Sequence, residues 1–517
     1  MDKRTYQDAL EALNTLQSNF AAVQAIRDSG FAAHKVAIQE MIEWCRKIGY
    51  EPSDFDRIKP IHVAGTKGKG STSAFISSIL TQYRQPTTQS SPRLDKVGLF
   101  TSPHLRFVRE RIQINNEPLS EEQFARYFFE LWDRMEMASP TKDGGSAVQK
   151  PMYFRYLTLM ALHAYFSESV NTAIIECGIG GEYDSTNVLV HPTITAVTSL
   201  GIDHTAMLGS TIGEIAWQKA GIFKPGAQAF TVPQPEEAMN VLRQRASKKG
   251  VDLVVVKRHP DLDKITLGLR ADFQKTNASL AVAVAASHLR ALGYTNIPNY
   301  PELLNQPLPP EFRRGLEQVR WPGRADIRKE NNITWHLDGC HTLESIELLG
   351  RWFSEQIALS DGKNASPSSG LDIERAVARH TRILVFNQQT RDANGLAKSL
   401  HRVLSSSLSS SQPFTHAVFC TNTTYPSGFN PDLISLNADS ISVDALTVQN
   451  ALAEMWKKLD GATEVKVVKS IKDALDWCRE VASTHGYQKG TDREVEVLIT
   501  GSMHLVGGAL EVLETGN

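Results

Sequence analysis

The sequence predicts an α/β protein with two domains: an N-terminal domain of the P-loop type around a central, mostly parallel sheet, and a smaller, Rossmann-like C-terminal domain. Short apolar runs alternate with helical patterns along most of the 517 residues, which is typical of α/β folds. The chain is also longer than one ordinary domain. The alternation stops in a polar stretch around residues 322–332 and then resumes. We therefore place a boundary near residue 325 and predict domains 1–325 and 326–517.

Composition and charge exclude several classes of protein. The 41% hydrophobic and 22% charged residues suit large buried cores, and a net charge of −2 is not that of a sequence-independent nucleic-acid binder. The longest apolar run, around residues 280–286, is too short to span a bilayer, and no apolar leader is recognised. Five cysteines without a C-x-x-C pair argue for reduced thiols. We expect a soluble intracellular protein that binds neither nucleic acid nor membrane.

The elements of the first domain follow from apolar periodicity. Strands are predicted at 61–64, 97–100, 172–176, 194–198 and 229–232. Helices are predicted at 72–83, 121–135, 153–166 and 277–292. Ser120 and Gln123 have the spacing of a capping box, in which the two side chains satisfy backbone N–H groups at the start of the helix from residue 121.

The second domain repeats the alternation after residue 332. Strands are predicted at 333–338, 382–386, 417–420, 465–468 and 495–500, with helices at 342–353, 394–404, 448–459, 471–482 and from 506 onward. The serine-rich stretches 364–370 and 405–412 predict surface loops, as do 84–95 and 138–150 in the first domain.

A glycine-rich turn follows the first strand, from Gly65 to Ser71. Glycines let backbone N–H groups approach an anion, the helix start adds partial positive charge, and Lys69 supplies a full charge for terminal phosphates. The strict Walker pattern is not met, because Gly70 separates Lys69 from Ser71. A tight turn without a ligand is the alternative, but the strand before it and the helix after it favour nucleotide binding.

Three further strand ends carry polar side chains: Ser102, Glu176 and His204. Open α/β sheets place ligand-binding groups at the carboxyl ends of their strands. A hydroxyl, a carboxylate and an imidazole can share an octahedral magnesium ion with waters and phosphate oxygens. The alternative is that His204 caps a helix and Glu176 pairs with an arginine.

Lys219 lies in a helical segment otherwise made of small and apolar residues. A lysine there can extend to solvent and play no chemical role. If buried, it would have a lowered pKa and could become reactive. The residues alone do not decide between these two.

Taken together, the motifs resemble the folylpolyglutamate synthases of the Mur ligase superfamily, and the eukaryotic branch more than the bacterial one. The matching segments, which span both domains in order, are VAGTKGKGS (63–71), TSPHL (101–105) with RER (109–111), IECGIGGEYDSTN (175–187), GIDHT (201–205), KAGI (219–222), WPGR (321–324), LDGCHT (337–342) and TGS (500–502). One departure is Cys340-His341-Thr342, where bacterial relatives commonly have Ala-His-Asn. It leaves details of the amino-acid site open.

The resemblance implies an ATP-dependent ligase that adds L-glutamate to the γ-carboxylate of a folate through an acyl phosphate, giving ADP and phosphate, in one-carbon metabolism. It implies ATP-binding residues in both domains: Thr66, Lys67, Gly68, Lys69, Gly70, Ser71, Asn277, Arg324 and Asp338. For Arg324 and Asp338 the alternative is a salt bridge that only stiffens the linker.

The resemblance also implies two Mg²⁺ ions, held by Ser102, Glu176, His204 and a carbamate formed on Lys219, and it allows a monovalent cation such as K⁺. Catalytic roles fall on Lys69, Lys219 and His341. The resemblance implies that Tyr153, Phe154, Arg155 and Asp184 contact folate. It implies that His341 and Ser502 contact glutamate. The family further suggests a monomer in the cytosol, with a mitochondrial form in some relatives.

Two other functions remain open at this level. Dihydrofolate synthase activity, the addition of the first glutamate to dihydropteroate, would use the same phosphate loop and metal residues, alone or alongside polyglutamylation. A nucleotide-dependent switch without ligation chemistry would bind ATP but show no glutamate-dependent release of phosphate. The lysine at 219 and the second α/β domain count against the switch.

Overall fold

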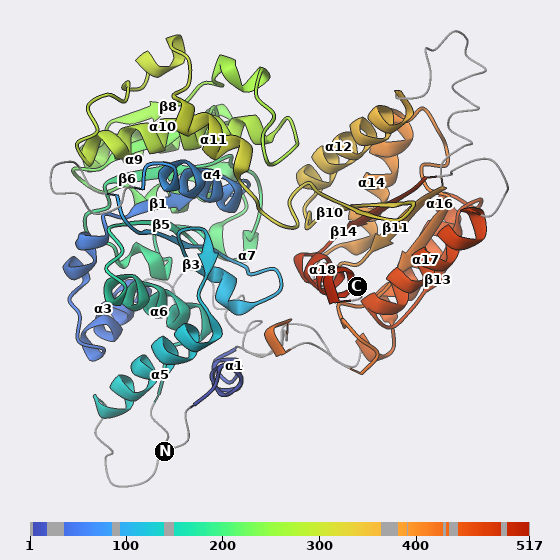
Figure 1. Ribbon diagram of the computed structural model, residues 1–517, viewed down its shortest axis with the longest axis horizontal. Helices are drawn as coiled ribbons and strands as arrows, with labels where there is room; N and C mark the ends of the chain where they lie inside the picture. The colour runs from blue at the N-terminus through green and yellow to red at the C-terminus, as the bar shows by residue number, and fades with distance from the viewer. Residues whose placement is uncertain are drawn as a thin grey trace. The chain divides into compact units, whose positions relative to one another are not determined.

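Figure 1 shows the computed structural model, which describes residues 4–17, 36–84, 94–138, 149–362, 381–389, 391–427, 431–433, 443–486 and 494–515. The chain divides into two compact units. The first holds Met1–His104 and Val108–Arg320, and the second holds Leu105–Phe107 and Trp321–Asn517. The boundary predicted near residue 325 lies a short way inside the second unit, and the sequence did not indicate that Leu105–Phe107 belongs there.

An eight-stranded, mostly parallel sheet forms the centre of the first unit, which confirms the predicted fold class. The strand order is β4-β3-β2-β5-β1-β6-β7-β8, in which β3 and β4 are antiparallel at one edge and the strands from β2 to β8 pair in parallel. The bounds are β1 (Ile61–Ala64), β2 (Val97–Phe100), β3 (Ile112–Ile114), β4 (Glu117–Pro118), β5 (Thr172–Glu176), β6 (Ile194–Val197), β7 (Gln228–Thr231) and β8 (Leu253–Val255). The carboxyl ends of β1, β2, β5 and β6 therefore meet at one edge of the sheet.

Helices cover both faces of this sheet (Figure 1). On one face lie α4 (Lys69–Thr81), α10 (Gln274–Ala291) and α11 (Pro310–Gln318), of which α4 packs against both of the others. On the other lie α3 (Ala37–Lys47), α5 (Glu121–Met137) and α6 (Tyr153–Ser167), whose apolar side chains form one core with β2 and β5. The remaining helices of the unit are α1 (Tyr6–Asn14), α7 (Thr205–Leu208), α8 (Ile212–Lys219) and α9 (Glu236–Lys249). Because both faces are covered, every residue of β1, β5 and β6 is buried, which explains why these strands are mostly apolar and do not alternate with exposed polar residues.

The second unit is built on a six-stranded sheet in the order β13-β12-β11-β14-β10-β9, antiparallel only at β9. Its strands are β9 (Asp326–Glu330), β10 (Ile333–Asp338), β11 (Thr381–Phe386), β12 (His416–Phe419), β13 (Glu464–Val467) and β14 (Val495–Thr500). Its helices are α12 (Leu343–Gly362), α14 (Ala393–Ser407), α16 (Thr447–Leu459), α17 (Ile471–Gly486) and α18 (Met503–Thr515). The last strand, β14, lies between β10 and β11, so Thr500 is in register with both Asp338 and Phe386. This brings three strand ends together.

Most predicted elements are present, and the differences have local causes. The capping box of Ser120 and Gln123 is confirmed at the start of α5. Helix α4 begins at Lys69 rather than at 72, because Gly68 in a left-handed conformation precedes it, and α18 begins at Met503 rather than at 506. Residues 405–407 of one predicted serine-rich loop belong to α14. The predicted loop 364–370 lies outside the described residues, as does most of 84–95 and 138–150. In the described part of the chain, no helix is long and apolar enough to cross a membrane.

Candidate active site

Two glycines shape the phosphate loop between β1 and α4. Gly65 has φ +150° and Gly68 has φ +82°, a backbone region that residues with a side chain rarely adopt. A Cβ atom on Gly65 would lie 1.8 Å from the hydroxyl oxygen of Thr198, and one on Gly68 would lie 2.2 Å from Oδ1 of Asn277. Both positions therefore require glycine, for backbone conformation and for space.

The loop is anchored to the end of β6 by hydrogen bonds. The backbone N–H groups of Thr66 and Lys67 both donate to the carbonyl of Ser199, at 3.0 Å each. The Thr198 hydroxyl donates to the carbonyl of Lys67 at 2.7 Å. These bonds fix the loop at the start of the 13-residue helix α4. Lys69, Gly70 and Ser71 then form its first turn, where backbone N–H groups lack intrahelical partners and can face an anion.

Asn277 reaches the phosphate loop from α10. Besides its closeness to Gly68, its Nδ2 donates to Oε1 of Gln274 at 2.8 Å, and Nε2 of Gln274 donates to the hydroxyl of Ser71 at 3.3 Å. All three side chains are buried. The structure thus places Asn277, predicted to contact ATP, against the predicted phosphate loop.

Lys219 is buried, which decides the question that the sequence left open. It ends α8, and only 3% of the residue is exposed. Its Nζ donates to the carbonyl of Gly65 at 2.8 Å. Burial, together with the nearby charge of Lys69, lowers the pKa of Lys219 to about 7. Near neutral pH the amine is therefore neutral in a large part of the molecules, beside the phosphate loop.

This lowered pKa predicts a specific dependence of stability on pH. In the unfolded chain a lysine has a pKa of about 10.4. Between about pH 7 and that value the unfolded chain binds more protons than the folded one, so stability must rise with pH. In carbonate-free buffer, we expect wild-type protein to gain about 3 kcal/mol of stability relative to Lys219→Met between about pH 6 and about pH 9. Denaturant unfolding of the two proteins at each pH measures this, and a difference that does not change with pH would contradict the buried amine.

Glu176 and Ser102 meet at the ends of β5 and β2. The backbone N–H of Ser102 donates to Oε2 of Glu176 at 3.0 Å, and Glu176 is buried. Arg111 is also buried there: its Nε donates to Nδ1 of His104 at 2.9 Å. Burial lowers the pKa of Arg111, and the charge of Glu176 opposes that shift. Arg111 is thus close enough for its charge to act on Glu176, and the alternative that Glu176 pairs with an arginine stays a prediction.

His204 lies at the start of α7 and is exposed, with φ +53°. It is the N-cap residue of this helix, as the alternative of a helix cap expected, but its side chain makes no capping hydrogen bond there. Asp203, which is buried, accepts the backbone N–H of His204 at 2.8 Å and lies 3.7 Å from Nζ of Lys67. Within the described residues, no group of three His, Cys, Asp or Glu side chains is close enough to hold a metal ion.

The residues predicted for folate divide into two kinds. Phe154, at the start of α6, packs on Gly178, where an added Cβ would lie 2.6 Å from its ring, and the ring of Tyr153 lies 5.5 Å from the guanidinium of Arg111. These two side chains therefore lie close to the end of β5 and the start of β3. Arg155 instead pairs with Glu40 of α3.

Asp184 shapes its own loop. It is buried, and its carboxylate accepts the backbone N–H groups of Ile179 and Thr186 at 2.9 and 3.0 Å and also the Thr186 hydroxyl. Burial raises its pKa, and these hydrogen bonds oppose the shift. Both carboxylate oxygens are thus bound by the chain, so the geometry favours a role in holding the loop over direct contact with a substrate.

In the second unit, Asp338 holds the turn that carries Arg324. Its Oδ2 accepts the backbone N–H of Ala325 at 2.8 Å, and the Cys340 thiol donates to its Oδ1 at 2.9 Å. The guanidinium of Arg324 is 3.8 Å from Oδ1, at the outer limit of an ion pair, and 27% of the Arg324 side chain is exposed. Asp338 is therefore a buried anchor, and Arg324 retains an accessible cationic group.

His341 and Ser502 follow two adjacent strands of that unit, β10 and β14. Nδ1 of His341 lies 3.0 Å from the carbonyl of Gly339, and the hydroxyl of Ser502 accepts the backbone N–H of His504 at the start of α18. The pKa of the Cys340 thiol is well above its usual value because of burial and the charge of Asp338, so it stays protonated. The structure thus places both predicted glutamate residues at the carboxyl edge of one sheet.

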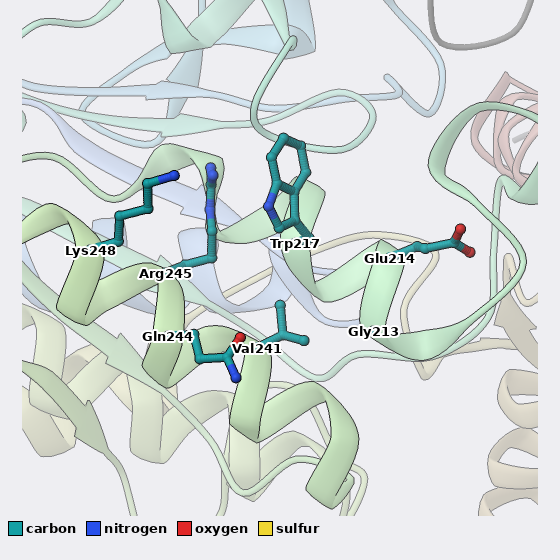
Figure 2. Close-up of a pocket in the computed structure, with 7 residues that line it drawn as sticks. All are labelled: Gly213, Glu214, Trp217, Val241, Gln244, Arg245 and Lys248. Carbon is teal, nitrogen blue, oxygen red and sulfur yellow. The ribbon is translucent and has the colours of Figure 1, made fainter.

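A surface cavity of about 450 Å³ lies elsewhere, between α8 and α9 (Figure 2). It is lined by Gly213, Glu214, Trp217, Val241, Gln244, Arg245 and Lys248, none of which was predicted as a site residue. The guanidinium of Arg245 stacks 4.2 Å from the Trp217 ring and pairs with Glu182. Because the Glu182 N–H in turn donates to the carbonyl of Gln218 at 2.7 Å, this cluster supports the end of α8 that carries Lys219.

Some residues of the site were not assigned a role from the sequence. Thr198 and Asp203 belong to the strand end and loop where His204 was noted, and Arg111 belongs to a motif that was matched as a whole. Their roles depend on contacts with the phosphate loop, Lys67 and Glu176, which lie far away along the chain. The only signal in the sequence is their place at strand ends next to residues that were singled out.

Comparison with known proteins identifies close relatives over nearly the full chain. The chain is 44% identical over 514 residues to a folylpolyglutamate synthase of Neurospora crassa, covering 99% of this chain and 92% of the relative. It is 41% identical over 521 residues to that of Saccharomyces cerevisiae, covering 99% and 87%. No family model matches the chain.

Solved bacterial structures share the fold. A Mycobacterium tuberculosis folylpolyglutamate synthase complexed with ADP superposes with a TM-score of 0.66 at 21% identity, covering 98% of this chain and 99% of that one. FolC of E. coli in complex with DHPP and ADP gives a TM-score of 0.63 at 22% identity, covering 99% and 98%. At such identities the likeness shows the fold alone.

Proposed function

The chain belongs to the folylpolyglutamate synthase family and catalyses the ATP-dependent addition of glutamate to folates; we propose that its first unit activates the γ-carboxylate of the folate and its second unit supplies the amino acid. The first part of this proposal depends on one observation: the amine of Lys219 is buried and donates a hydrogen bond to the phosphate loop. A bare phosphate-binding turn needs no such lysine, whereas charge-rich phosphoryl transfer does benefit from reactive groups held there.

For ATP, we propose that Thr66, Lys67, Gly68, Gly70 and Ser71 line the phosphate site, with the first-turn N–H groups of α4 facing the phosphates, and that Lys69 offsets their charge as a catalytic residue. Asn277 contacts the nucleotide from α10, and its position against Gly68 supports this. In the second unit, Arg324 and Asp338 contact ATP. The accessible guanidinium of Arg324 suits phosphate oxygens.

For magnesium, we propose one ion held by oxygen donors at the adjoining ends of β5 and β2 together with an imidazole that follows β6. Glu176 is a buried carboxylate, Ser102 adjoins it, and the exposed imidazole of His204 is not used as a cap. Bound there, Mg²⁺ would offset the negative charge of the phosphates during transfer. Lys219, as a carbamate, would hold the second ion. A monovalent cation such as K⁺ stays a prediction from the resemblance.

The reaction itself has two steps in this proposal. A carboxylate oxygen of the folate attacks the γ-phosphorus of ATP, ADP leaves, and an acyl phosphate forms. The neutral amine of glutamate then attacks the acyl carbon, phosphate leaves and the amide nitrogen loses a proton. We propose that His341 and Ser502 orient the amine, and that Tyr153 and Phe154 contact the folate. Arg155 and Asp184 are assigned less direct roles, because both are paired within the unit.

A paired assay separates this function from its alternatives. Purified protein with ATP, magnesium and glutamate should release phosphate with tetrahydrofolate as the acceptor. Release with dihydropteroate as well would show an additional dihydrofolate synthase activity. Release that does not depend on glutamate with either acceptor would indicate a nucleotide switch and overturn the ligase. We further propose that the protein acts as a monomer in the cytosol, with a mitochondrial form as a second location.

Replacing Asp338 tests the nucleotide contact in the second unit. Because Asp338 holds the N–H of Ala325, the change to alanine leaves a buried donor unsatisfied and should cost about 1–3 kcal/mol of stability. Asp338→Asn keeps an oxygen for that N–H, so its melting temperature should stay close to wild type. We expect its affinity for ATP to fall about tenfold, through loss of one charged hydrogen-bond acceptor.

Equilibrium titration with ATP, beside thermal melts without ligand, measures both effects. Asp392→Asn is the matched control, since Asp392 is an exposed cap of α14 in the same unit. Unchanged ATP affinity in a folded Asp338→Asn protein would show that Asp338 only anchors the turn.

A further inference from the structure

A cluster of five carboxamides lies beyond the ends of β11 and β12 in the second unit. Its members are Asn387, Gln388, Gln389, Asn422 and Gln449. Asn387 and Gln449 are fully buried, and Gln388 is 4% exposed. Buried amides are costly unless they are hydrogen-bonded, so a cluster of them points to a requirement other than packing.

Gln388 links this cluster to the turn that carries Ser502. Its Nε2 donates to the carbonyl of Gly501 at 2.8 Å, a buried hydrogen bond across 113 residues of sequence. Gly501 has φ +106°, and a Cβ atom on it would lie 2.4 Å from the carbonyl oxygen of Asn387. The turn after β14 thus lies in close contact with the backbone after β11, and the side chain of Gln388 hydrogen-bonds to it there.

The rest of the cluster holds Asn387 and Gln388 in place. Nδ2 of Asn387 donates to Oδ1 of Asn422 at 2.9 Å, and Nε2 of Gln449 donates to Oδ1 of Asn387 at 2.8 Å. Gln449 also reaches Oε1 of Gln389 and the carbonyl of Cys420. Its own Oε1, like the hydroxyl of Thr500, is buried and has no hydrogen-bond partner among the residues that the structure describes. A cluster that served only to fill the core would not be expected to leave buried polar atoms unsatisfied.

The position of the cluster is also informative. β14 is inserted between β10 and β11, although it is last in the chain, and such switch points are where open α/β sheets bind ligands. Asp338, Thr500 and Phe386 end these three strands in register. Gln388 lies two residues after Phe386, and Ser502 two residues after Thr500.

We infer that Gln388 is a positioning residue for the amino-acid substrate: it fixes the turn at Gly501 so that Ser502 is held where glutamate binds. The inference rests on the proposed function, in which Ser502 contacts glutamate. A neutral amide suits the task, because it fixes the carbonyl of Gly501 without adding a charge next to a substrate that carries two carboxylates.

The test replaces the amide of Gln388 while keeping its length. Gln388→Met removes the donor to Gly501, and Gln388→Glu keeps the shape but presents only acceptors when ionised. Initial rates of ADP formation are measured with varied glutamate and then with varied ATP, together with thermal melts. Gln244→Met, an exposed glutamine of α9 in the first unit, is the matched control.

We expect the KM for glutamate to rise about tenfold in Gln388→Met and further in Gln388→Glu, with the KM for ATP changing less than about twofold. The control should match wild type. A purely structural role would lower the melting temperature and leave the KM for glutamate unchanged, and that result would overturn the inference. Wild-type protein that forms no ADP in response to glutamate would instead reject the proposed function, so the two failures are distinguishable.

Discussion

Replacing Glu176 with alanine is expected to lower turnover by at least about a hundredfold while the protein still folds. The side chain is a buried carboxylate at the end of β5, where it accepts the N–H of Ser102. In the proposed site it is the charged ligand of the magnesium ion that offsets phosphate charge during transfer. The loss should therefore fall mainly on kcat, because that charge builds up in the transition state.

Glu176→Gln is the matched variant for this experiment. It keeps an oxygen for the N–H of Ser102 and the shape of the side chain, but it removes the charge that a metal ligand needs. Steady-state rates at varied magnesium, with thermal melts of both variants, separate folding from catalysis. Wild-type turnover of either variant at ordinary magnesium concentrations would refute the assignment of Glu176 as a metal ligand.

Lys219→Ala should be nearly inactive, and a short-chain carboxylic acid added to the solution should restore part of the activity. The proposed chemistry starts from the neutral amine, whose nitrogen attacks the carbon of CO₂ and loses one proton to form a carbamate. Burial provides that neutral amine, since it lowers the pKa of Lys219 to about 7. The alanine variant leaves space next to the carbonyl of Gly65, where a small carboxylate can take the place of the carbamate.

Lys224→Ala is the control, because Lys224 is a second lysine with a lowered pKa in the same region. Burial lowers its pKa to about 8, and its Nζ donates to the carbonyl of Asn187 at 3.2 Å rather than to the phosphate loop. We expect this variant to retain most of the activity and to gain nothing from added carboxylic acid. A Lys219→Ala protein that turns over at the wild-type rate would exclude the carbamate.

Much of the fold could be predicted because the central strands carry strong local signals. β1, β2 and β5 have the predicted bounds, since strands covered by helices on both faces form short, mostly apolar runs. The predicted start of α4 was too late, because glycine is not typical of a helix and Gly70 nevertheless lies in the first turn of α4. Short strands at or next to the edges of the sheet, such as β3 and β8, were not predicted, because each has only three residues.

From the sequence, the site could be predicted only for residues at strand ends and in recognised motifs. Glu176 and Ser102 were singled out separately, and the parallel pairing of β2 with β5 brings them into contact. The burial of Lys219 could not be predicted, because it depends on the packing of α8 against β1. Likewise, nothing local indicates that Gln388 reaches Gly501, since the insertion of β14 between β10 and β11 is a property of the whole sheet.

Mass spectrometry of the reaction products tests the ligase function most directly. Purified protein is incubated with ATP, magnesium, tetrahydrofolate and L-glutamate, and the folate products are followed over time beside the formation of ADP and phosphate. We expect products that grow by one glutamyl residue at a time, with one ADP and one phosphate formed for each residue added. ATP consumed without any glutamylated folate, or glutamate added to dihydropteroate but not to tetrahydrofolate, would contradict it.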